Sequence, residues 1–336
     1  AGAALAAAAL MLVLPAMGTY AAELSPGFAV IAELHRLPRV RETVLAMHER
    51  VAADLRRHQA WTAIPPMRTL PSPVDYEWYE LAKLWQSGYD GPIWFLADPR
   101  RTDLRLIDPQ SRTLLRQYGW SNRGLPYLGG MRPNRIDWYF MQRPGWFLGQ
   151  GWALTPEIGR VTARDLRERA GSPAVAWVRR RRSGLTMAIG GRHLGAPSDP
   201  PIVLRVSVDG VAVDEWPIEP GAFLFMRPLL PEEMEGTETY ARLELAATWQ
   251  APGVAPVSLE QFDLQSIDGA MVAYDRGWWE PEHDERTGRN WRWSSGEATL
   301  WLYNPGRDLS LVLTGSAPSG REVTVLAGDE ELGRFD

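Results

Sequence analysis

The stretch AVAWVRRRRSGLTMAIGG (174–191) aligns without a gap with ATLWLYNPGRDLSLVLTG (298–315), at an offset of 124 residues. Apolar residues recur at the same places along both stretches, and alternation of this kind is typical of strands. Self-similarity at a fixed offset indicates a repeated structural unit. The identical pairs are Ala174 with Ala298, Trp177 with Trp301, Leu185 with Leu309, and Gly191 with Gly315.

The repeat extends to both sides of this pair. Upstream, the dipeptide GW at 151–152 matches GW at 277–278 at an offset of 126. Downstream, LRVSVDGVAVDEW (204–216) resembles VTVLAGDEELGRF (323–335). Short apolar-alternating runs separated by Gly, Pro and Asp turns are the pattern of a β-sandwich. The runs that predict strands are 174–180, 184–191, 202–210, 222–230 and 241–249.

The fold class that follows is mainly β. We expect two tandem, jelly-roll-like β-sandwiches, repeat 1 at 151–268 and repeat 2 at 269–336. The first copy continues through further strands after Trp216, whereas the second has no matching continuation, so we expect repeat 2 to be truncated. A sandwich without its last strands has unpaired edges, which leads us to expect a fragment of a longer protein at both ends.

The region before the sandwiches has a different pattern. Residues 61–150 predict a small α/β segment, with a helix over 71–91, strands over 91–98 and 103–108, and an aromatic strand-like run over 136–152. Residues 23–60 predict a helical stalk, because apolar residues recur there at helical spacing. That stripe consists of Val40, Val44, Met47, Val51 and Leu55.

Residues 1–22, AGAALAAAALMLVLPAMGTYAA, carry no charged side chain. The run is long enough to be most of a membrane span. We expect the remnant of a transmembrane helix, with a signal peptide that has lost its basic start as the alternative.

Composition excludes several classes of protein. The hydrophobic fraction of 45% and the charged fraction of 23% are those of a folded globular chain. A net charge of −5 argues against nucleic acid as a partner, because no basic excess is present to neutralise phosphates. The absence of cysteine excludes disulfides, zinc–thiolate sites and cysteine nucleophiles. No nucleophile elbow, phosphate-binding loop or dinucleotide fingerprint occurs in the sequence.

The densest cluster of chemistry-bearing residues is GWWEPEHDERTGRNWRWSSGEATLWL (277–302). In a strand, Trp291 and Trp293 share one face while Arg292 lies on the other. Exposed indoles stack on sugar rings, but the interpretation that we favour is that these indoles fill the sandwich core or its end, with Arg289 or Arg292 in cation–π contact. The candidates for carbohydrate binding are Trp279, Trp291, Trp293, Arg289 and Arg292. The part EPEHDERTGRNWRW (280–293) has no evident counterpart in the first copy and is expected to be an insertion.

Acidic residues in the same stretch allow other chemistry. Glu280, Glu282 and Asp284 are candidates for a hard metal ion, for which Ca²⁺ is the expected ion, although a solvated loop explains them as well. Glu280 and Glu282 are also candidates for the paired carboxylates of a glycoside hydrolase. No other cofactor is expected. The stretch GGRHLG (190–195) predicts a turn between strands.

Four phrases of the sequence resemble a known family. They are GPIWFLADPRRTDLRLIDP, DWYFMQRPGWFLGQGWALTPE, MAIGGRHLG and GWWEPEHDERTGRNWRWSS. Over about 90–336 the chain resembles the soluble C-terminal region of large bacterial polytopic membrane glycosyltransferases of the dolichyl-phosphate-mannose mannosyltransferase type. The resemblance implies a parent enzyme whose catalytic acidic residue lies in an early external loop, so no catalytic residue carries over to this chain.

Together these observations predict a non-catalytic extracytoplasmic module of a membrane glycosyltransferase that uses a polyprenyl-phosphate sugar donor. Its expected partners are a glycan or lipid-linked sugar and, through the N-terminal helix, the cell membrane, with the soluble part in the periplasm. A secreted carbohydrate-binding protein is the first alternative, and a glycoside hydrolase is the second.

Overall fold

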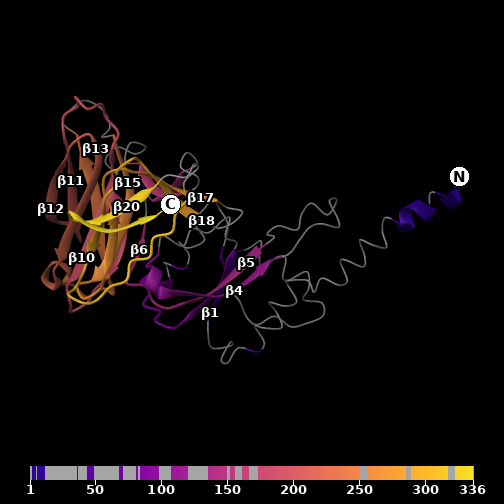
Figure 1. The fold of residues 1–336 in the computed structure, drawn as a ribbon. Helices are drawn as coiled ribbons and strands as arrows, with labels where there is room; N and C mark the ends of the chain where they lie inside the picture. The colour runs from indigo at the N-terminus through magenta and orange to yellow at the C-terminus, as the bar shows by residue number, and fades with distance from the viewer. Residues whose placement is uncertain are drawn as a thin grey trace. The chain divides into compact units, whose positions relative to one another are not determined.

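The computed structural model describes the chain as mainly β (Figure 1). Apart from a helical segment at 2–4 and 6–11, short helical turns and connecting loops, the described residues form strands. The chain divides into two compact units, Ala1–Tyr303 and Asn304–Asp336. The structure describes residues 2–4, 6–11, 36, 44–48, 68–70, 81, 84–97, 107–119, 135–149, 152–155, 161–165, 173–249, 256–284, 289–316 and 322–335.

A five-stranded mixed sheet precedes the sandwich. Its parallel half joins β1 to β2 and β3, and its antiparallel half joins β3 to β5 and β5 to β4. A short helical turn around Leu81 and 84–86 ends at Gly88, which has φ +87°, and it buries Trp85. In sheet order the strands are β2 (Arg68–Leu70), β1 (Val44–His48), β3 (Ile93–Ala97), β5 (Arg135–Met141) and β4 (Arg112–Gly119).

Strand β1 corrects part of the predicted helical stalk. Residues 44–48 carry two of the five apolar residues that predicted a helix, yet they form a strand with a neighbour on each edge. A short apolar run is compatible with either structure, and pairing with β2 and β3 decides the outcome. The other residues of that stripe lie outside the described residues.

The first sandwich consists of two five-stranded sheets; Figure 1 labels β6, β11 and β12 of one and β10, β13 and β15 of the other. Every strand predicted between 174 and 249 is confirmed. One sheet has the order β12 (Val211–Ile218), β11 (Ile202–Val208), β14 (Tyr240–Thr248), β9 (Ala174–Arg179) and β6 (Trp146–Leu148). The other has the order β13 (Gly221–Leu229), β10 (Leu185–His193), β15 (Val257–Ser266), β8 (Val161–Asp165) and β7 (Ala153–Thr155).

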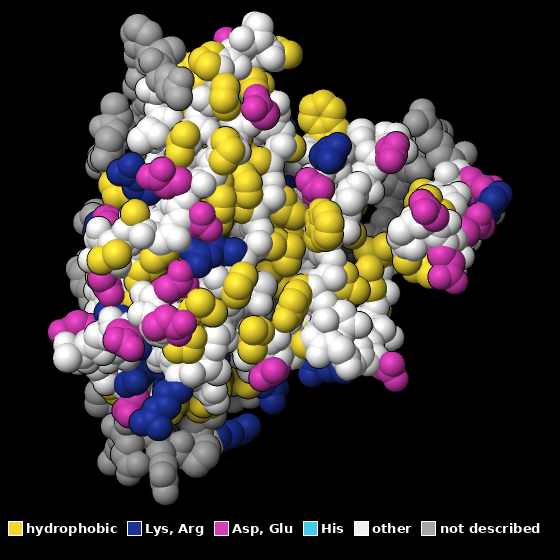
Figure 2. Space-filling model, turned by 90° about the vertical axis from the view of Figure 1, so that its left-hand side faces the viewer, with side chains coloured by type: hydrophobic (Ala, Val, Ile, Leu, Met, Phe, Trp, Pro, Cys, Tyr) yellow, Lys and Arg dark blue, Asp and Glu magenta, His cyan; other side chains and the backbone are white. Residues whose placement is uncertain are grey.

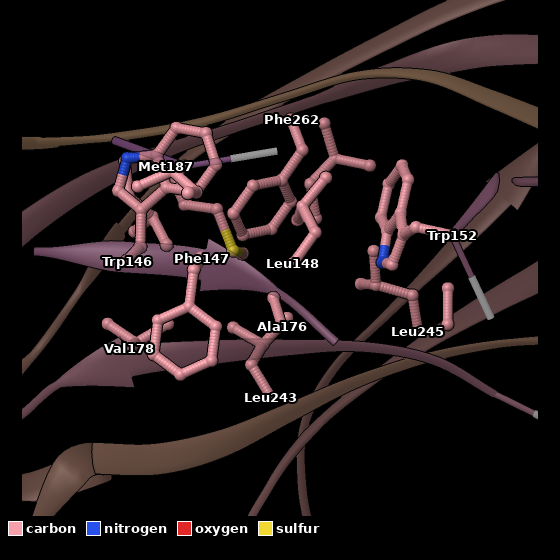
Figure 3. Packing of buried hydrophobic residues seen from close by; sticks show 14 of the residues in the cluster. Trp146, Phe147, Leu148, Trp152, Ala176, Val178, Met187, Leu243, Leu245 and Phe262 are labelled. Atoms are coloured by element: carbon pink, nitrogen blue, oxygen red, sulfur yellow. The ribbon is translucent and has the colours of Figure 1, made fainter. Parts of the chain in front are cut away.

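The two aromatic side chains of β6 are buried on opposite faces of their sheet, Trp146 toward the facing sheet and Phe147 toward the outer face (Figure 3). Phe147 is fully buried, and its ring lies 5.1 Å from that of Tyr240 and 5.9 Å from that of Trp85. Trp146 and Trp152 both meet Phe262 edge-on, with ring centroids 5.3 and 6.0 Å apart. The Tyr240 hydroxyl donates to the Pro144 carbonyl at 3.0 Å, so its polar end is satisfied inside the core.

The turn predicted at GGRHLG is wrong, because strand β10 continues through Gly190, Gly191 and Arg192 to His193. Its register with β15 shifts between Gly190 and Gly191, as at a β-bulge. A Cβ at Gly191 would lie 2.0 Å from the Ser258 carbonyl oxygen, so the close approach of β15 requires glycine there.

The internal repeat is visible in strand register. Strands β16 (Met271–Tyr274) and β19 (Leu300–Tyr303) pair as β6 pairs with β9. The offsets are 126 on the first strand and 124 on the second, as in the sequence alignment. The corresponding pairs are Trp146↔Val178 with Val272↔Leu302, Phe147↔Trp177 with Ala273↔Trp301, and Leu148↔Ala176 with Tyr274↔Leu300.

The hairpin of β20 (Val323–Ala327) and β21 (Glu330–Phe335) repeats the hairpin of β11 and β12 at an offset of 119. Both hairpins have a two-residue turn and a register shift at the same step. The corresponding pairs are Val206↔Asp214 with Val325↔Gly333, Ser207↔Ala212 with Leu326↔Glu331, and Val208↔Val211 with Ala327↔Glu330.

Strands β17 (Trp278–Asp284) and β18 (Arg289–Ser294) follow β16 as β7 and β8 follow β6. The stretch 280–293 therefore lies in the counterpart of the β7–β8 hairpin, which corrects its prediction as an insertion. Within the described ranges, no strand of the second copy corresponds to β13, β14 or β15, and the copy consists of three separate two-stranded sheets. The described residues of the first copy thus form two five-stranded antiparallel sheets, and those of the second form separate strand pairs.

The N-terminal prediction stays a prediction. Within the described ranges, no helix is long and apolar enough to cross a membrane. Residues 12–22, which make up the rest of the apolar run, lie outside the described residues.

We expect Phe147→Ala to lower the free energy of unfolding by about 3–5 kcal/mol, because it leaves a cavity where the outer face of the β6–β9 sheet packs against Trp85. Phe335→Ala removes the same atoms from a side chain that is 61% exposed. It should therefore change the free energy of unfolding by less than about 0.5 kcal/mol. Urea denaturation of the full chain measures both. Equal effects of the two changes would contradict this account of the core.

Candidate functional site

The β17–β18 hairpin presents three exposed indoles. On β18, strand alternation places Trp291 and Trp293 on one face and Arg292 on the other. Trp291 is 37% exposed, Trp293 is 47% exposed and Trp279 is 56% exposed. Within the described chain, none of the three belongs to a hydrophobic core cluster. The hairpin therefore presents flat apolar surface to solvent.

A β-bulge brings Trp279 into this group. The register of β17 with β18 shifts between Trp278 and Pro281, so Trp279 lies in the bulge that faces the Trp293 position. Farther along the hairpin, Glu282 pairs directly with Trp291 and is half-buried. Directly opposed residues of an antiparallel pair share a face, which gives the indole surface one carboxylate.

Arg292 belongs to the opposite side of the hairpin. Its guanidinium lies 4.5 Å from the ring centroid of Tyr274, a cation–π contact. It also donates to the backbone carbonyls of Glu260 and Trp279, each at 3.4 Å. Trp278 completes this side, with its ring 5.2 Å from that of Tyr274 and its Nε1 donating to the Thr299 carbonyl at 2.9 Å.

Arg192 of β10 attaches the hairpin to the first sandwich. Its guanidinium reaches Glu280 of β17 at 2.5 Å and Glu260 of β15 at 3.5 Å, and it donates to the Trp278 carbonyl at 3.2 Å. The Glu260 side chain is only 5% exposed, whereas that of Glu280 is 32% exposed. One cation thus joins a buried carboxylate of the sandwich to a carboxylate of the hairpin.

Burial raises the pKa of Glu260 above its usual value. The positive charges of Arg192 and Arg292 act in the opposite direction, while Glu280 adds to the increase. The net direction shows that loss of solvation outweighs the attraction of the two arginines.

The predicted sugar-binding residues fall into three groups. Trp279, Trp291 and Trp293 come together on one hairpin, and Arg292 lies on its other side. Arg289 begins β18, and its side chain lies outside the described residues. The sequence alone did not reveal Arg192 and Glu260, because the first lay in a predicted turn and the second in an unremarkable strand pattern.

The predicted metal ligands do not form a described site. Glu280 is engaged by Arg192, Glu282 faces the indole side, and the Asp284 side chain lies outside the described residues. The described ranges hold no group of three or more His, Asp or Glu side chains placed to hold an ion. Ca²⁺ stays a prediction from the sequence.

Comparisons with known proteins give distant likenesses. No protein-family model and no curated protein matches the chain. Among solved structures, it is similar to the EclA C-terminal domain, a sugar-binding protein, with 8% identity and a TM-score of 0.25 over 31% of this chain and 76% of that one. It is also similar to dimeric latent PorU from Porphyromonas gingivalis, with 14% identity and a TM-score of 0.25 over 42% and 17%. Likeness at this level carries no argument about the site.

We expect Arg192→Leu to lower the free energy of unfolding by about 3–5 kcal/mol, because it leaves Glu260 buried without its partner. Adding Glu260→Leu should recover most of that loss. The control is Arg205→Leu, which breaks an exposed ion pair with Glu215 and should cost at most about 1 kcal/mol. Denaturant unfolding measures all three variants, and a double variant no better than Arg192→Leu would contradict the proposed role of the buried charge.

The raised pKa of Glu260 predicts a signed pH dependence. Its contribution to stability is fully present below the ordinary value of 4.5 and is lost as pH rises through the folded-state pKa. The free energy of unfolding of the wild type minus that of Glu260→Gln should therefore fall with rising pH above 4.5. Denaturation across a pH series measures the difference, and Glu297→Gln, at an exposed position, is the control. A rising difference would contradict the direction.

Proposed function

We propose that this chain is a non-catalytic carbohydrate-binding module. The observation that carries the proposal is the set of exposed indoles of Trp279, Trp291 and Trp293 on one hairpin of a β-sandwich protein. Large apolar side chains exposed together mark a binding surface more often than chance exposure does. Indoles offer sugars a flat apolar face with a polar edge.

The hairpin geometry favours a glycan chain over a single sugar. Alternate residues of a strand lie about 6.6–6.8 Å apart, so Trp291 and Trp293 present two adjacent platforms. Trp279 extends the surface onto the neighbouring strand, and Glu282 beside Trp291 supplies a hydrogen-bond acceptor for sugar hydroxyls. The carboxylate also disfavours anionic polysaccharides.

The larger context is a proposal that rests on the sequence. The resemblance over about 90–336, together with the apolar run at 1–22, supports a module of a membrane glycosyltransferase with a polyprenyl-phosphate sugar donor. The module would lie on the periplasmic side of the cell membrane and bind acceptor glycan or lipid-linked sugar. A secreted carbohydrate-binding protein would use the same indole surface, and fractionation of the natural protein between membrane and periplasm distinguishes the two.

The arrangement of Glu280 disfavours the glycoside hydrolase. That enzyme class needs two carboxyl groups facing one glycosidic bond, one of them free to donate a proton. Here the Glu280 carboxylate lies 2.5 Å from the Arg192 guanidinium, and this ion pair holds the hairpin against the sandwich. Its neighbour Glu282 faces the indole side of the hairpin.

We expect wild-type protein to bind a neutral polysaccharide on a glycan array, and Trp291→Ala or Trp293→Ala to weaken that binding at least about tenfold, or 1.4 kcal/mol. Trp301→Ala is the matched control, since its indole is also 56% exposed but belongs to β19. Titration with the best glycan measures affinity, and circular dichroism checks the fold. Absence of binding by the wild type, or an equal loss in Trp301→Ala, would remove the proposed site.

A further inference from the structure

Four consecutive arginines, 179–182, lie where the chain passes from strand β9 to strand β10. Arg179 is the last residue of β9, and Arg181 and Arg182 lie in the exposed turn before Leu185 begins β10. At the offset of 124, the second copy has YNPG (303–306) in the same place, without a charged side chain. The repeated unit therefore does not require arginine at these positions.

The fold uses one of the four arginines. The Arg180 guanidinium pairs with Asp209 at 2.6 Å and donates to three backbone carbonyls of the segment between β13 and β14. Arg180 thus joins two connecting segments of the sandwich. No ion pair with a described residue is formed by the other three, Arg179, Arg181 and Arg182.

Other arginines of the first sandwich lie beside carboxylates. Arg205 pairs with Glu215 and Arg227 pairs with Glu233, each at 2.6 Å. Figure 2 shows the same arrangement across one face of the molecule, where most Lys and Arg side chains lie next to Asp or Glu side chains. Three guanidiniums without a carboxylate partner among the described residues therefore distinguish the β9–β10 turn from the rest of the sandwich.

Two of these three guanidiniums lie close to Tyr240. Arg179 pairs directly with Tyr240 between β9 and β14, so the two side chains share a face of the sheet. A Cβ at Gly145 would lie 2.9 Å from a guanidinium nitrogen of Arg181. The carbonyl of the residue just before Gly145 accepts the Tyr240 hydroxyl. The hydroxyl therefore marks the place where the two arginines meet.

A third guanidinium lies near the same hydroxyl. Burial raises the pKa of Tyr240, while the positive charges of Arg143, Arg179 and Arg181 act in the opposite direction. Such interactions weaken with distance, so all three guanidiniums lie near this one group. Arg143 precedes β6 and donates to two backbone carbonyls at the end of the helical turn that buries Trp85. Cations from two separate segments of the chain thus come together.

The carboxylates beside these cations do not balance them. Asp108 is 6% exposed and accepts the Gly145 N–H at 2.9 Å. Asp90 lies 3.8 Å from Arg143, but its side chain is 85% exposed, and ion pairs at such positions are weak. Positive charge is therefore in excess here, in a protein whose net charge is −5. The group that we call the arginine cluster consists of Arg143, Arg179, Arg181 and Arg182.

We propose that the arginine cluster is a binding site for a phosphate monoester or diphosphate group, carried either by a soluble compound or by a lipid headgroup. A guanidinium donates two parallel hydrogen bonds to phosphate oxygens, and several of them around one point suit a group with two or more negative charges. The turn adds further donors, because no hydrogen bond within the described chain uses the backbone N–H of Arg181, Arg182 or Ser183. Successive N–H groups of a turn bind anions.

This site is separate from the proposed sugar-binding surface. No residue of the arginine cluster belongs to the β17–β18 hairpin. The inference therefore does not depend on sugar binding, and either proposal can fail without the other.

The first experiment titrates the full chain with inorganic pyrophosphate at low ionic strength and measures affinity by calorimetry. We expect Arg181→Gln combined with Arg182→Gln to weaken binding at least tenfold. The matched control combines Arg205→Gln with Arg334→Gln, which also removes two exposed guanidiniums, and its affinity should stay within twofold of the wild type. Each double variant makes the net charge of −5 more negative by two, so the comparison separates the cluster from overall charge.

Vesicles distinguish the two sources of the phosphate group. Co-sedimentation with phosphatidylcholine vesicles is measured with and without phosphatidic acid, whose headgroup is a phosphate monoester. Binding that rises with phosphatidic acid and falls in the cluster variant identifies a lipid headgroup. Pyrophosphate binding without such a rise identifies a soluble phosphate compound. Both results support the proposed site.

Three results would overturn the proposal. One is the absence of pyrophosphate binding together with no effect of phosphatidic acid. Another is an equal loss in the control variant, which assigns binding to overall charge. The third comes from the unchanged protein, in which backbone amide chemical shifts of 181–183 should move when pyrophosphate is added. Binding without such a change would place the phosphate elsewhere, so this measurement decides even if the variants unfold.

Discussion

Strand β14 holds one sheet of the first sandwich together, because it pairs with β11 on one edge and β9 on the other. Strand β15 does the same in the facing sheet, between β10 and β8. Both strands come late in their copy, so the earlier strands depend on residues that follow them. Among the described residues, the corresponding segments of the second copy form three separate strand pairs. Each central strand therefore does two things at once: it pairs with the strands on both of its edges, and its side chains cover the core.

The same dependence extends to the hairpin that carries the tryptophans. Among the described strands, β17 and β18 pair only with each other. They contact the first copy through the ion pairs of Arg192 with Glu260 and Glu280 and through the hydrogen bond from Arg292 to the Glu260 carbonyl. A buried charge is costly unless it is paired, so this contact favours one position of the hairpin, with Glu280 beside Arg192. The indoles on the other face are then held at a fixed site while they stay open to solvent.

The sandwich could be predicted from the sequence because its strands are short, alternate strictly and are bounded by turn residues, as 202–210 and 241–249 illustrate. The repeat could be predicted because Trp177 and Trp301 occupy equivalent positions in an ungapped alignment of the sequence. The segment 44–48 was predicted as helix because apolar residues from Val40 to Leu55 recur at helical spacing, whereas its pairing with β2 and β3 makes it a strand. The ion pairs of Arg192 could not be predicted from the sequence, because its partners lie more than sixty residues away and on different strands.

The sequence by itself determined the β class, the duplication and five strands of the first copy, β9, β10, β11, β13 and β14, since local alternation and turn chemistry specify these features. Tertiary structure alone decided three further points. It set Arg292 against Tyr274 and the tryptophans toward solvent, it joined Glu260 to Glu280 through Arg192, and it brought Arg143, Arg179 and Arg181 together near the Tyr240 hydroxyl. Each of these contacts depends on which distant strand becomes a neighbour. The free energy of the whole sheet determines that neighbour, and no short stretch of the chain does so alone.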